Sequence, residues 1–127
     1  MAYVEGFVIA VPTANREEFL THARFFDQML IDEGALRVVE CWGDDVPPGK
    51  TTDFPGAVKA TAEETVCFSW IEWPDKETRT ACHEKMAEKM KSGEFDKMAG
   101  NLSQMPFDGT RMIFGGFVPI LDLGSAK

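Results

Sequence analysis

The chain has 127 residues and a mass of 14.1 kDa, the size of one ordinary domain. Its 13 basic and 21 acidic residues give a formal net charge of −8 and a sequence pI near 4.7. This balance argues against nucleic acid and membrane surfaces as partners, because both carry negative charge. A hydrophobic content of 44% excludes disorder, and three cysteines, an odd number, indicate a reducing compartment rather than a disulfide framework.

The N-terminal stretch does not have the pattern of a signal peptide. Residues 1–12 lack a basic region, carry Glu5 among their apolar residues and run into Pro12. No stretch reaches the roughly 18 to 20 apolar residues that a membrane span requires. We therefore expect a cytoplasmic protein.

The first third of the chain predicts a strand, a helix and a second strand. The strands cover Tyr3–Val11 and Ala35–Trp42, which are rich in β-branched and aromatic residues. Asn15 is the predicted N-cap of the helix, Glu18 is its capping-box partner, and Gly34 ends the helix.

A long loop follows, because residues 43–55 hold three prolines, two glycines and three aspartates. A short extended piece is predicted at Gly56–Ala60, and a third strand at Thr65–Trp73.

The last part of the chain predicts two helical segments and a strand. A helix begins at Pro74-Asp75 and ends at Gly93, and a short helical turn covers Glu94–Ala99. The fourth strand covers Arg111–Val118. The resulting order is typical of the ferredoxin-like α+β fold, βαββαβ with an antiparallel sheet, and we predict one such domain over residues 1–127.

Both faces of the predicted strands are apolar, although two helices on one side can cover only one face. In the first strand Phe7 and Ile9 alternate with Val4 and Val8. A bare apolar sheet face usually marks an interface, so we expect a second copy of the chain to cover it and form a homodimer. The alternative is a cover made by the long loop and the C-terminal tail.

The order of motifs resembles that of the YbaA-like bacterial family of unknown function. The similarity is carried by Val39-Glu40-Cys41-Trp42, Asp45-Val46-Pro47, Gly49-Lys50, Thr52-Asp53-Phe54, Ala57-Val58-Lys59-Ala60, Phe68-Ser69-Trp70-Ile71-Glu72-Trp73-Pro74, Met105-Pro106-Phe107-Asp108-Gly109, Arg111-Met112-Ile113 and Gly115-Gly116-Phe117. The resemblance implies a dimeric α+β barrel, in which two sheets face each other. That superfamily includes monooxygenases, haem proteins, isomerases and stress-induced barrels, so it leaves the chemistry open.

Two histidines are the first candidates for catalysis. His22 lies within the apolar arc of the first helix, and His83 lies beside a stripe of methionines on the second. Both imidazoles are expected to point into a cleft between helices and sheet, where either could act as an acid or a base. The alternative for each is a partly buried histidine bonded to a backbone carbonyl.

Charged residues within strands form a second group, which comprises Glu5, Arg37, Glu40, Glu72 and Arg111. They can pair with one another as structural ion pairs. In the functional interpretation Arg37 or Arg111 grips a ligand carboxylate, and Glu40 is the candidate catalytic base.

Aromatic residues and one aspartate complete the candidate ligand-binding set. Trp42 and Trp70 are expected to hold a ligand, and Asp53 is expected either to contribute to that site or to anchor the long loop. The cysteines are interpreted as small buried hydrophobic residues. We predict no metal and no cofactor, because no histidine and cysteine spacing supplies a ligand set.

Two functions remain open at this point. The first is a dimer that binds a small organic molecule in each subunit, as a cofactor-independent oxygenase or isomerase by superfamily analogy. The second is a non-enzymatic, stress-linked binding or interaction protein whose charged sites are structural.

Overall fold

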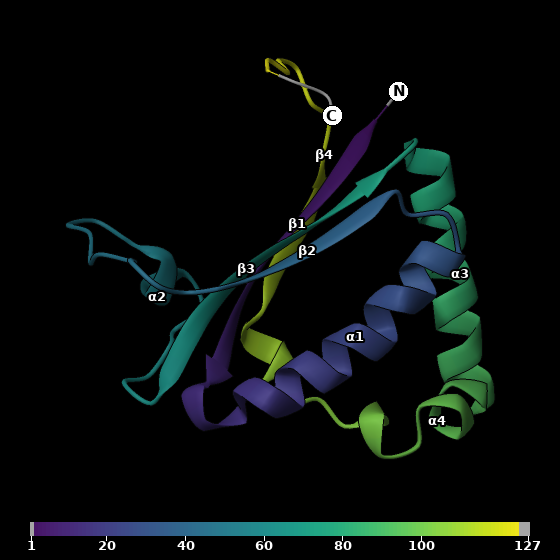
Figure 1. The fold of residues 1–127 in the computed structure, drawn as a ribbon, viewed down its shortest axis with the longest axis horizontal. Coiled ribbons are helices and arrows are strands. Elements are labelled where there is room, and N and C mark those ends of the chain that lie inside the picture. The colour runs from purple at the N-terminus through teal and green to yellow at the C-terminus, as the bar shows by residue number, and fades with distance from the viewer. Residues whose placement is uncertain (1, 125–127) are drawn as a thin grey trace.

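A single antiparallel sheet of four strands organises the computed structural model, which describes residues 2–124. Its strands are β1 (Tyr3–Pro12), β2 (Arg37–Trp42), β3 (Glu64–Trp73) and β4 (Ile113–Phe117). They lie in the order β2-β3-β1-β4, and all three neighbouring pairs are antiparallel (Figure 1). This is the predicted ferredoxin-like α+β architecture.

The two long helices, α1 (Arg16–Asp32) and α3 (Lys76–Ser92), cover the same face of the sheet, which we call the inner face (Figure 1). The short α4 (Glu94–Ala99) follows α3 directly. One face of the sheet is thus covered by helices, as the predicted topology requires. Within residues 2–124, none of the helices has the length and apolar character needed to cross a membrane.

The predicted ends of the second long helix are confirmed. Asp75 is the N-cap of α3, and its side chain accepts a hydrogen bond of 2.7 Å from the backbone nitrogen of Thr78. Gly93 ends the helix with a left-handed φ of 83°, which glycine adopts without steric cost.

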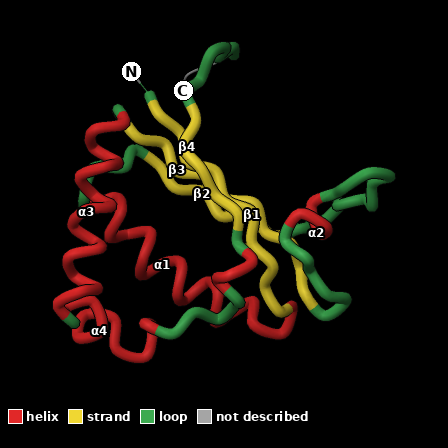
Figure 2. The backbone as a smooth tube through the Cα atoms, turned by 180° about the vertical axis from the view of Figure 1, so that it is seen from behind, coloured by secondary structure: helices red, strands yellow, loops and turns green. Residues whose placement is uncertain are grey.

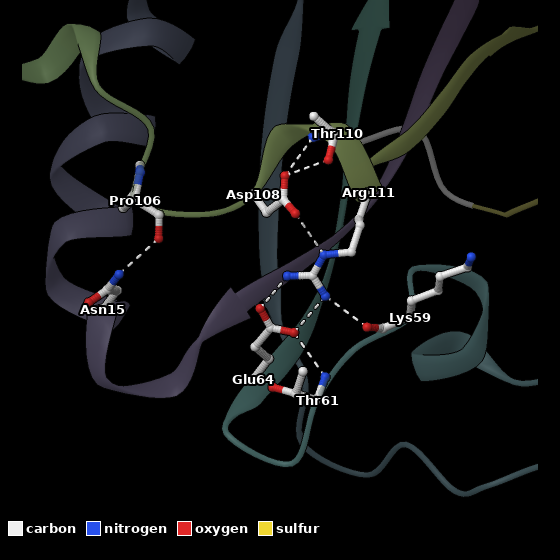
Figure 3. A network of polar contacts seen from close by, with 8 residues as sticks. All are labelled: Asn15, Lys59, Thr61, Glu64, Pro106, Asp108, Thr110 and Arg111. Atoms are coloured by element: carbon white, nitrogen blue, oxygen red, sulfur yellow. Dashed lines mark hydrogen bonds and ion pairs between the residues drawn. The ribbon is translucent and has the colours of Figure 1, made fainter.

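Asn15 is the N-cap residue of α1, as predicted, but the predicted capping box does not form. Asn15 closes a 3-10 turn at Thr13–Asn15 and makes no side-chain capping bond to α1. Its amide instead donates a hydrogen bond of 2.9 Å to the carbonyl oxygen of Pro106 (Figure 3). This long-range contact fixes the segment before β4 against the start of α1.

The predicted extended piece at residues 56–60 is also wrong. Phe54–Ala57 forms a short helix, α2, whose N-cap Asp53 accepts a 2.6 Å hydrogen bond from the backbone nitrogen of Gly56. Pro55 fits the first turn of a helix, where its missing N–H is not needed. This helical turn lies on the other side of the sheet from α1 and α3 (Figure 2).

The face opposite the helices, which we call the outer face, is covered only at one end. Val58, next to α2, is buried against Ala10 and Val66 on this face. Elsewhere large apolar side chains are exposed, among them Phe68 at 44%, Ile113 at 45% and Phe117 at 61%. The long loop thus covers part of the outer face and leaves an apolar surface beyond it.

The inner face is packed in two hydrophobic clusters. Tyr3, Trp73 and Cys82 belong to the cluster beneath α3, whereas Ile9 and Phe19 belong to the cluster beneath α1. Three polar side chains share this face of the sheet with them, namely Glu5, Glu40 and Ser69. Burial of these groups requires partners, which directs attention to the space between the helices and the sheet.

Candidate functional site

An apolar cavity of about 320 Å³ lies between the inner face and the helices. Its wall is built from five phenylalanines, four methionines and five aliphatic residues, which are Phe7, Phe19, Phe26, Phe95, Phe107, Met86, Met90, Met105, Met112, Ile9, Ala23, Leu30, Val38 and Ile71. The remaining wall residues are polar: His22, Asp27, Glu40 and Ser69. Such a cavity combines flexible apolar walls with a few polar groups, as small-molecule sites commonly do.

Asp27 and Glu40 form a carboxyl pair in this cavity. Asp27 is contributed by α1, whereas Glu40 lies on β2 directly opposite Ser69 of β3. Burial of Asp27, followed by its hydrogen bond to Glu40 and the Glu40 charge, raises the pKa of Asp27 to about 9. Asp27 is therefore protonated at neutral pH, and its O–H donates to the Glu40 carboxylate.

One oxygen of this pair has spare accepting capacity. Oε1 of Glu40 is buried, and apart from Asp27 it has no hydrogen-bond partner within residues 2–124. The Asp27 proton supplies one donor, but an ionised carboxylate has about four accepting positions. Nε of Arg79 is the other buried polar side-chain atom without a partner among these residues, and Arg79 stacks on Tyr3 outside the cavity.

His22 lines the cavity, as expected. Its ring packs against Phe26 with centroids 4.3 Å apart and meets Phe107 edge-on at 6.2 Å. Burial lowers the pKa of His22, so the imidazole is neutral at pH 7. The expected alternative, a bond to a backbone carbonyl, is not found within residues 2–124.

His83 does not line the cavity, so the expectation that both imidazoles point into one cleft is wrong. Its Nε2 lies 3.1 Å from Oε2 of Glu5, a residue that is only 2% exposed. Oε1 of Glu5 also accepts a hydrogen bond of 2.9 Å from Nε1 of Trp73. The partner of the His83 imidazole is therefore the Glu5 carboxylate, and not the backbone carbonyl considered from the sequence.

Arg111 forms a network of hydrogen bonds and ion pairs just before β4 (Figure 3). Its guanidinium makes two bonds to Glu64, of 2.6 and 2.8 Å, and one of 3.0 Å to Asp108. It also donates to the backbone carbonyl of Lys59 at 2.7 Å. Arg111 belongs to a 3-10 turn at Gly109–Arg111 rather than to the strand, so the predicted strand begins two residues too early.

Only one of the predicted pairs among strand charges forms. Arg37 lies 3.6 Å from Glu72 on the outer face. Glu5 and Glu40 instead meet His83 and Asp27, because both glutamates face the helices while Arg37 faces the opposite side of the sheet. Opposite charges on neighbouring strands therefore do not pair where the pleat of the strand points their side chains to different faces of the sheet.

The remaining predicted ligand-binding residues also lie outside the cavity wall. Trp42 packs on Phe19 and beneath the Arg16 guanidinium. Trp70 faces outward and donates a 2.9 Å hydrogen bond to Glu72. Asp53 accepts from the backbone nitrogens of Gly49 and Gly56, at 3.0 and 2.6 Å, and thereby anchors the long loop.

Asp27 is the site residue that the sequence reasoning missed. It lies four positions after Ala23 and three before Leu30, within the apolar arc that predicted the buried face of the helix. A carboxyl group at such a position is itself a signal of a functional or paired acid. Ser69 was missed for a different reason, since a small polar residue in a strand carries no distinctive pattern.

Two of the three cysteines have the buried character that the sequence indicated, whereas Cys41 is only half-buried. All three are free, and Cys67 and Cys82 are fully buried. Burial raises the pKa of the Cys67 thiol to about 12, so it stays protonated and unreactive. Within residues 2–124, no group of three or more histidine, cysteine or acidic side chains is placed to hold a metal ion.

The antiparallel sheet with two helices on one face defines a ferredoxin-like α+β protein. Two solved structures, each described as a dimeric ferredoxin-like protein from an uncultured marine organism, share this fold. The first has a TM-score of 0.56 at 14% identity and covers 97% of this chain and 99% of its own. The second has a TM-score of 0.53 at 11% identity and covers 97% of this chain and 100% of its own.

The chain belongs to the family described as "Protein of unknown function (DUF1428)", whose model matches residues 2–109. It is 48% identical over 122 residues to the "Uncharacterized protein YbaA" of Escherichia coli strain K12 and to that of Shigella flexneri. Each alignment covers 96% of this chain and 99% of the relative. The resemblance inferred from the sequence motifs is thereby confirmed.

Proposed function

We propose that the protein binds a small, mostly apolar organic molecule in the cavity and transfers a proton on it. The observation that carries this proposal is an apolar cavity of about 320 Å³ that contains a hydrogen-bonded carboxyl pair. A volume of this size lies within the usual range for small-molecule sites, roughly 300 to 1,000 Å³. The paired carboxyl groups supply an acid and a base in one place.

Proton transfer is the step that gives the superfamily analogy a chemical basis in this chain. A cofactor-independent isomerase moves a proton between two positions of its substrate, and a cofactor-independent oxygenase first removes one. Asp27 and Glu40 are the groups proposed to do this, with the neutral His22 beside them. His83 is not part of this proposal, because Glu5 engages it outside the cavity.

A non-enzymatic binding protein is the alternative, and the cavity wall gives it some support. Four methionines line the cavity, and their flexible side chains suit adaptable binding without turnover. The Arg111 network and the contact between Glu5 and His83 are structural under either function. Measured proton transfer separates the two functions.

We further propose that the working unit is a homodimer in the cytoplasm. The exposed apolar side chains Phe68, Ile113 and Phe117 lie on the outer face, where a second sheet would cover them. Two copies related by a two-fold axis would bury equivalent surfaces. The free cysteines agree with a reducing compartment.

Ligand binding can be tested by thermal unfolding with matched probes of one skeleton. The neutral compounds 2-naphthol and 2-tetralone are expected to raise the melting temperature, whereas the anion 2-naphthoate is not, because it would meet the Glu40 carboxylate. Ala23→Leu places a larger side chain in the cavity wall and should abolish the effect, and Ala87→Leu on the exposed side of α3 is the control. Equal shifts in both variants would contradict binding in this cavity.

A further inference from the structure

We propose that the Asp27–Glu40 pair interconverts the keto and enol forms of a neutral, apolar ketone, with Glu40 as the base and Asp27 as the acid. This inference rests on the proposed function, since it needs a ligand in the cavity. It goes further by assigning a role to each carboxyl group and by naming the class of substrate.

The two carboxyl groups reach the cavity from different elements. Glu40 is held on β2, and Asp27 projects from α1, so a ligand between helix and sheet can contact both. The buried Oε1 of Glu40 has accepting capacity beyond the Asp27 proton, in surroundings that are otherwise mostly apolar. An acceptor in such surroundings is poorly solvated, and this makes it a stronger base toward a bound C–H group.

The surroundings of the two carboxyl groups give them different roles, with Asp27 as the acid and Glu40 as the base. The raised pKa of Asp27 keeps its proton in place at neutral pH, while the carboxylate of Glu40 accepts from it. Pairs of carboxyl groups held in opposite protonation states are typical of acid–base catalysis. Among residues 2–124, no arginine or lysine lines the cavity to neutralise Glu40, and His22 is uncharged at this pH.

The reaction balances without a further reactant. Glu40 removes a proton from the carbon next to the carbonyl, so a C–H bond breaks and an O–H bond forms on Glu40. The electron pair of that C–H bond becomes the carbon–carbon double bond, and the carbonyl oxygen takes the proton of Asp27 to give the enol. Glu40 then holds a proton and Asp27 a negative charge, and transfer from Glu40 to Asp27 along their hydrogen bond restores the starting state.

The charge and shape of the cavity select the substrate. A carboxylate or phosphate on the ligand would face the Glu40 charge in an apolar site whose described wall holds no lysine or arginine to balance it. The phenylalanine and methionine walls match an aromatic or alicyclic body. A neutral ketone satisfies both conditions, because its carbonyl oxygen accepts from Asp27 while its body meets the walls.

Deuterium exchange provides the test, because it follows C–H cleavage even when the natural substrate is unknown. The probe is 2-tetralone in D₂O, with loss of its α-proton signals followed by NMR. The wild-type protein is expected to accelerate exchange at least about tenfold over buffer, and Glu40→Gln should return it to the buffer rate. Asp27→Asn should reduce the protein-catalysed part of the rate, which is the excess over buffer, by about 10²-fold, the lower end of the range for general acid catalysis.

Matched controls lie on the same elements as the two tested residues. Glu72→Gln changes a glutamate of the same sheet on the outer face, and Asp32→Asn changes an exposed aspartate of α1. Both should exchange 2-tetralone at the wild-type rate. Glu40→Asp withdraws the carboxylate while keeping its charge, so it should exchange more slowly and provides a second test if Glu40→Gln fails to fold.

Each outcome decides between the two proposals. If 2-tetralone raises the melting temperature but exchanges no faster than in buffer, the reaction is excluded and the binding site stands. Wild-type exchange rates in folded Glu40→Gln or Glu40→Asp would also overturn the assignment of the base. If neither 2-tetralone nor 2-naphthol shifts the melting temperature, the proposed function and this inference both fail.

Discussion

Asp27 and Glu40, which are 13 positions apart in the sequence, form a hydrogen-bonded carboxyl pair inside an apolar cavity. A pair of like charges in such a place costs stability unless one group is neutral. The fold keeps this arrangement by burying Asp27 beside Glu40, between α1 and the sheet. A costly arrangement of this kind is typical of a functional site rather than of a structural one.

The first prediction concerns the stability cost of Asp27. Its pKa is about 9 in the folded protein and near 3.8 when unfolded, so the folded state binds the proton more tightly. The contribution of Asp27 to the free energy of unfolding therefore falls as pH rises from about 4 to 9. Asp27→Asn keeps a hydrogen-bond donor toward Glu40 and has no proton to lose, so it should be more stable than the wild type at pH 8, by about 1 to 3 kcal/mol.

Urea unfolding at pH 4 and pH 8 measures this effect. The advantage of Asp27→Asn should be small at pH 4, because Asp27 is protonated in the folded state and this pH lies close to its unfolded pKa of 3.8. Asp32→Asn should show no such pH dependence, because Asp32 is exposed. An advantage that is equal at both pH values would contradict the raised pKa.

The second prediction concerns the buried carboxylate of Glu5. Glu5→Ala leaves the indole N–H of Trp73 buried without its acceptor and removes the partner of His83. A buried donor without a partner is costly, so we expect a loss of about 2 to 4 kcal/mol in the free energy of unfolding. Glu17→Ala, at an exposed ion pair with Arg16, should change it by less than about 1 kcal/mol. Equal effects would mean that the Glu5 contacts contribute little.

The third prediction concerns acid sensitivity at Glu64. The hydrogen bonds from Arg111 lower the pKa of Glu64 to about 2, below its ordinary value of 4.5. Because the folded pKa is depressed, the stabilisation is present above pH 4.5 and is lost as pH falls toward 2. The difference in melting temperature between wild type and Glu64→Gln should therefore narrow between pH 5 and pH 2. A constant difference would contradict the pairing.

The fourth prediction concerns assembly through the outer face. Light scattering should give a mass of twice 14.1 kDa for the wild type. Phe68→Asp places a charge in the exposed apolar patch and should shift the protein to the 14.1 kDa monomer. Ile31→Asp, on the opposite side of the molecule in α1, should leave the mass unchanged. A wild-type monomer at micromolar concentration would remove the dimer from the proposal.

The order of elements was predictable from the sequence because strand and helix periodicity are local properties. The α3 boundaries at Asp75 and Gly93 followed from capping chemistry that involves only neighbouring residues. Asn15 shows the limit of this reasoning, since its amide bonds to Pro106, which is 91 positions away. A competing long-range partner leaves no trace in the local pattern.

The candidate site was predictable only in part for the same reason. His22 and Glu40 could be selected because a polar residue in an apolar helix arc or strand is conspicuous. Their partners depend on which face of the pleat each strand residue takes and on where α1 crosses the sheet. Asp27 therefore became visible as a partner of Glu40 only when the helix was packed on the sheet.

The most direct measurement of the central claim is the titration of the Asp27 side-chain carboxyl carbon by ¹³C NMR. We predict a midpoint near pH 9 in the wild type. In Glu40→Gln the midpoint should fall, because the Glu40 charge is lost, yet stay above 3.8 because burial remains. A midpoint near 4 in both proteins would mean that neither burial nor Glu40 raises the pKa of Asp27, and would contradict the proposed carboxyl pair.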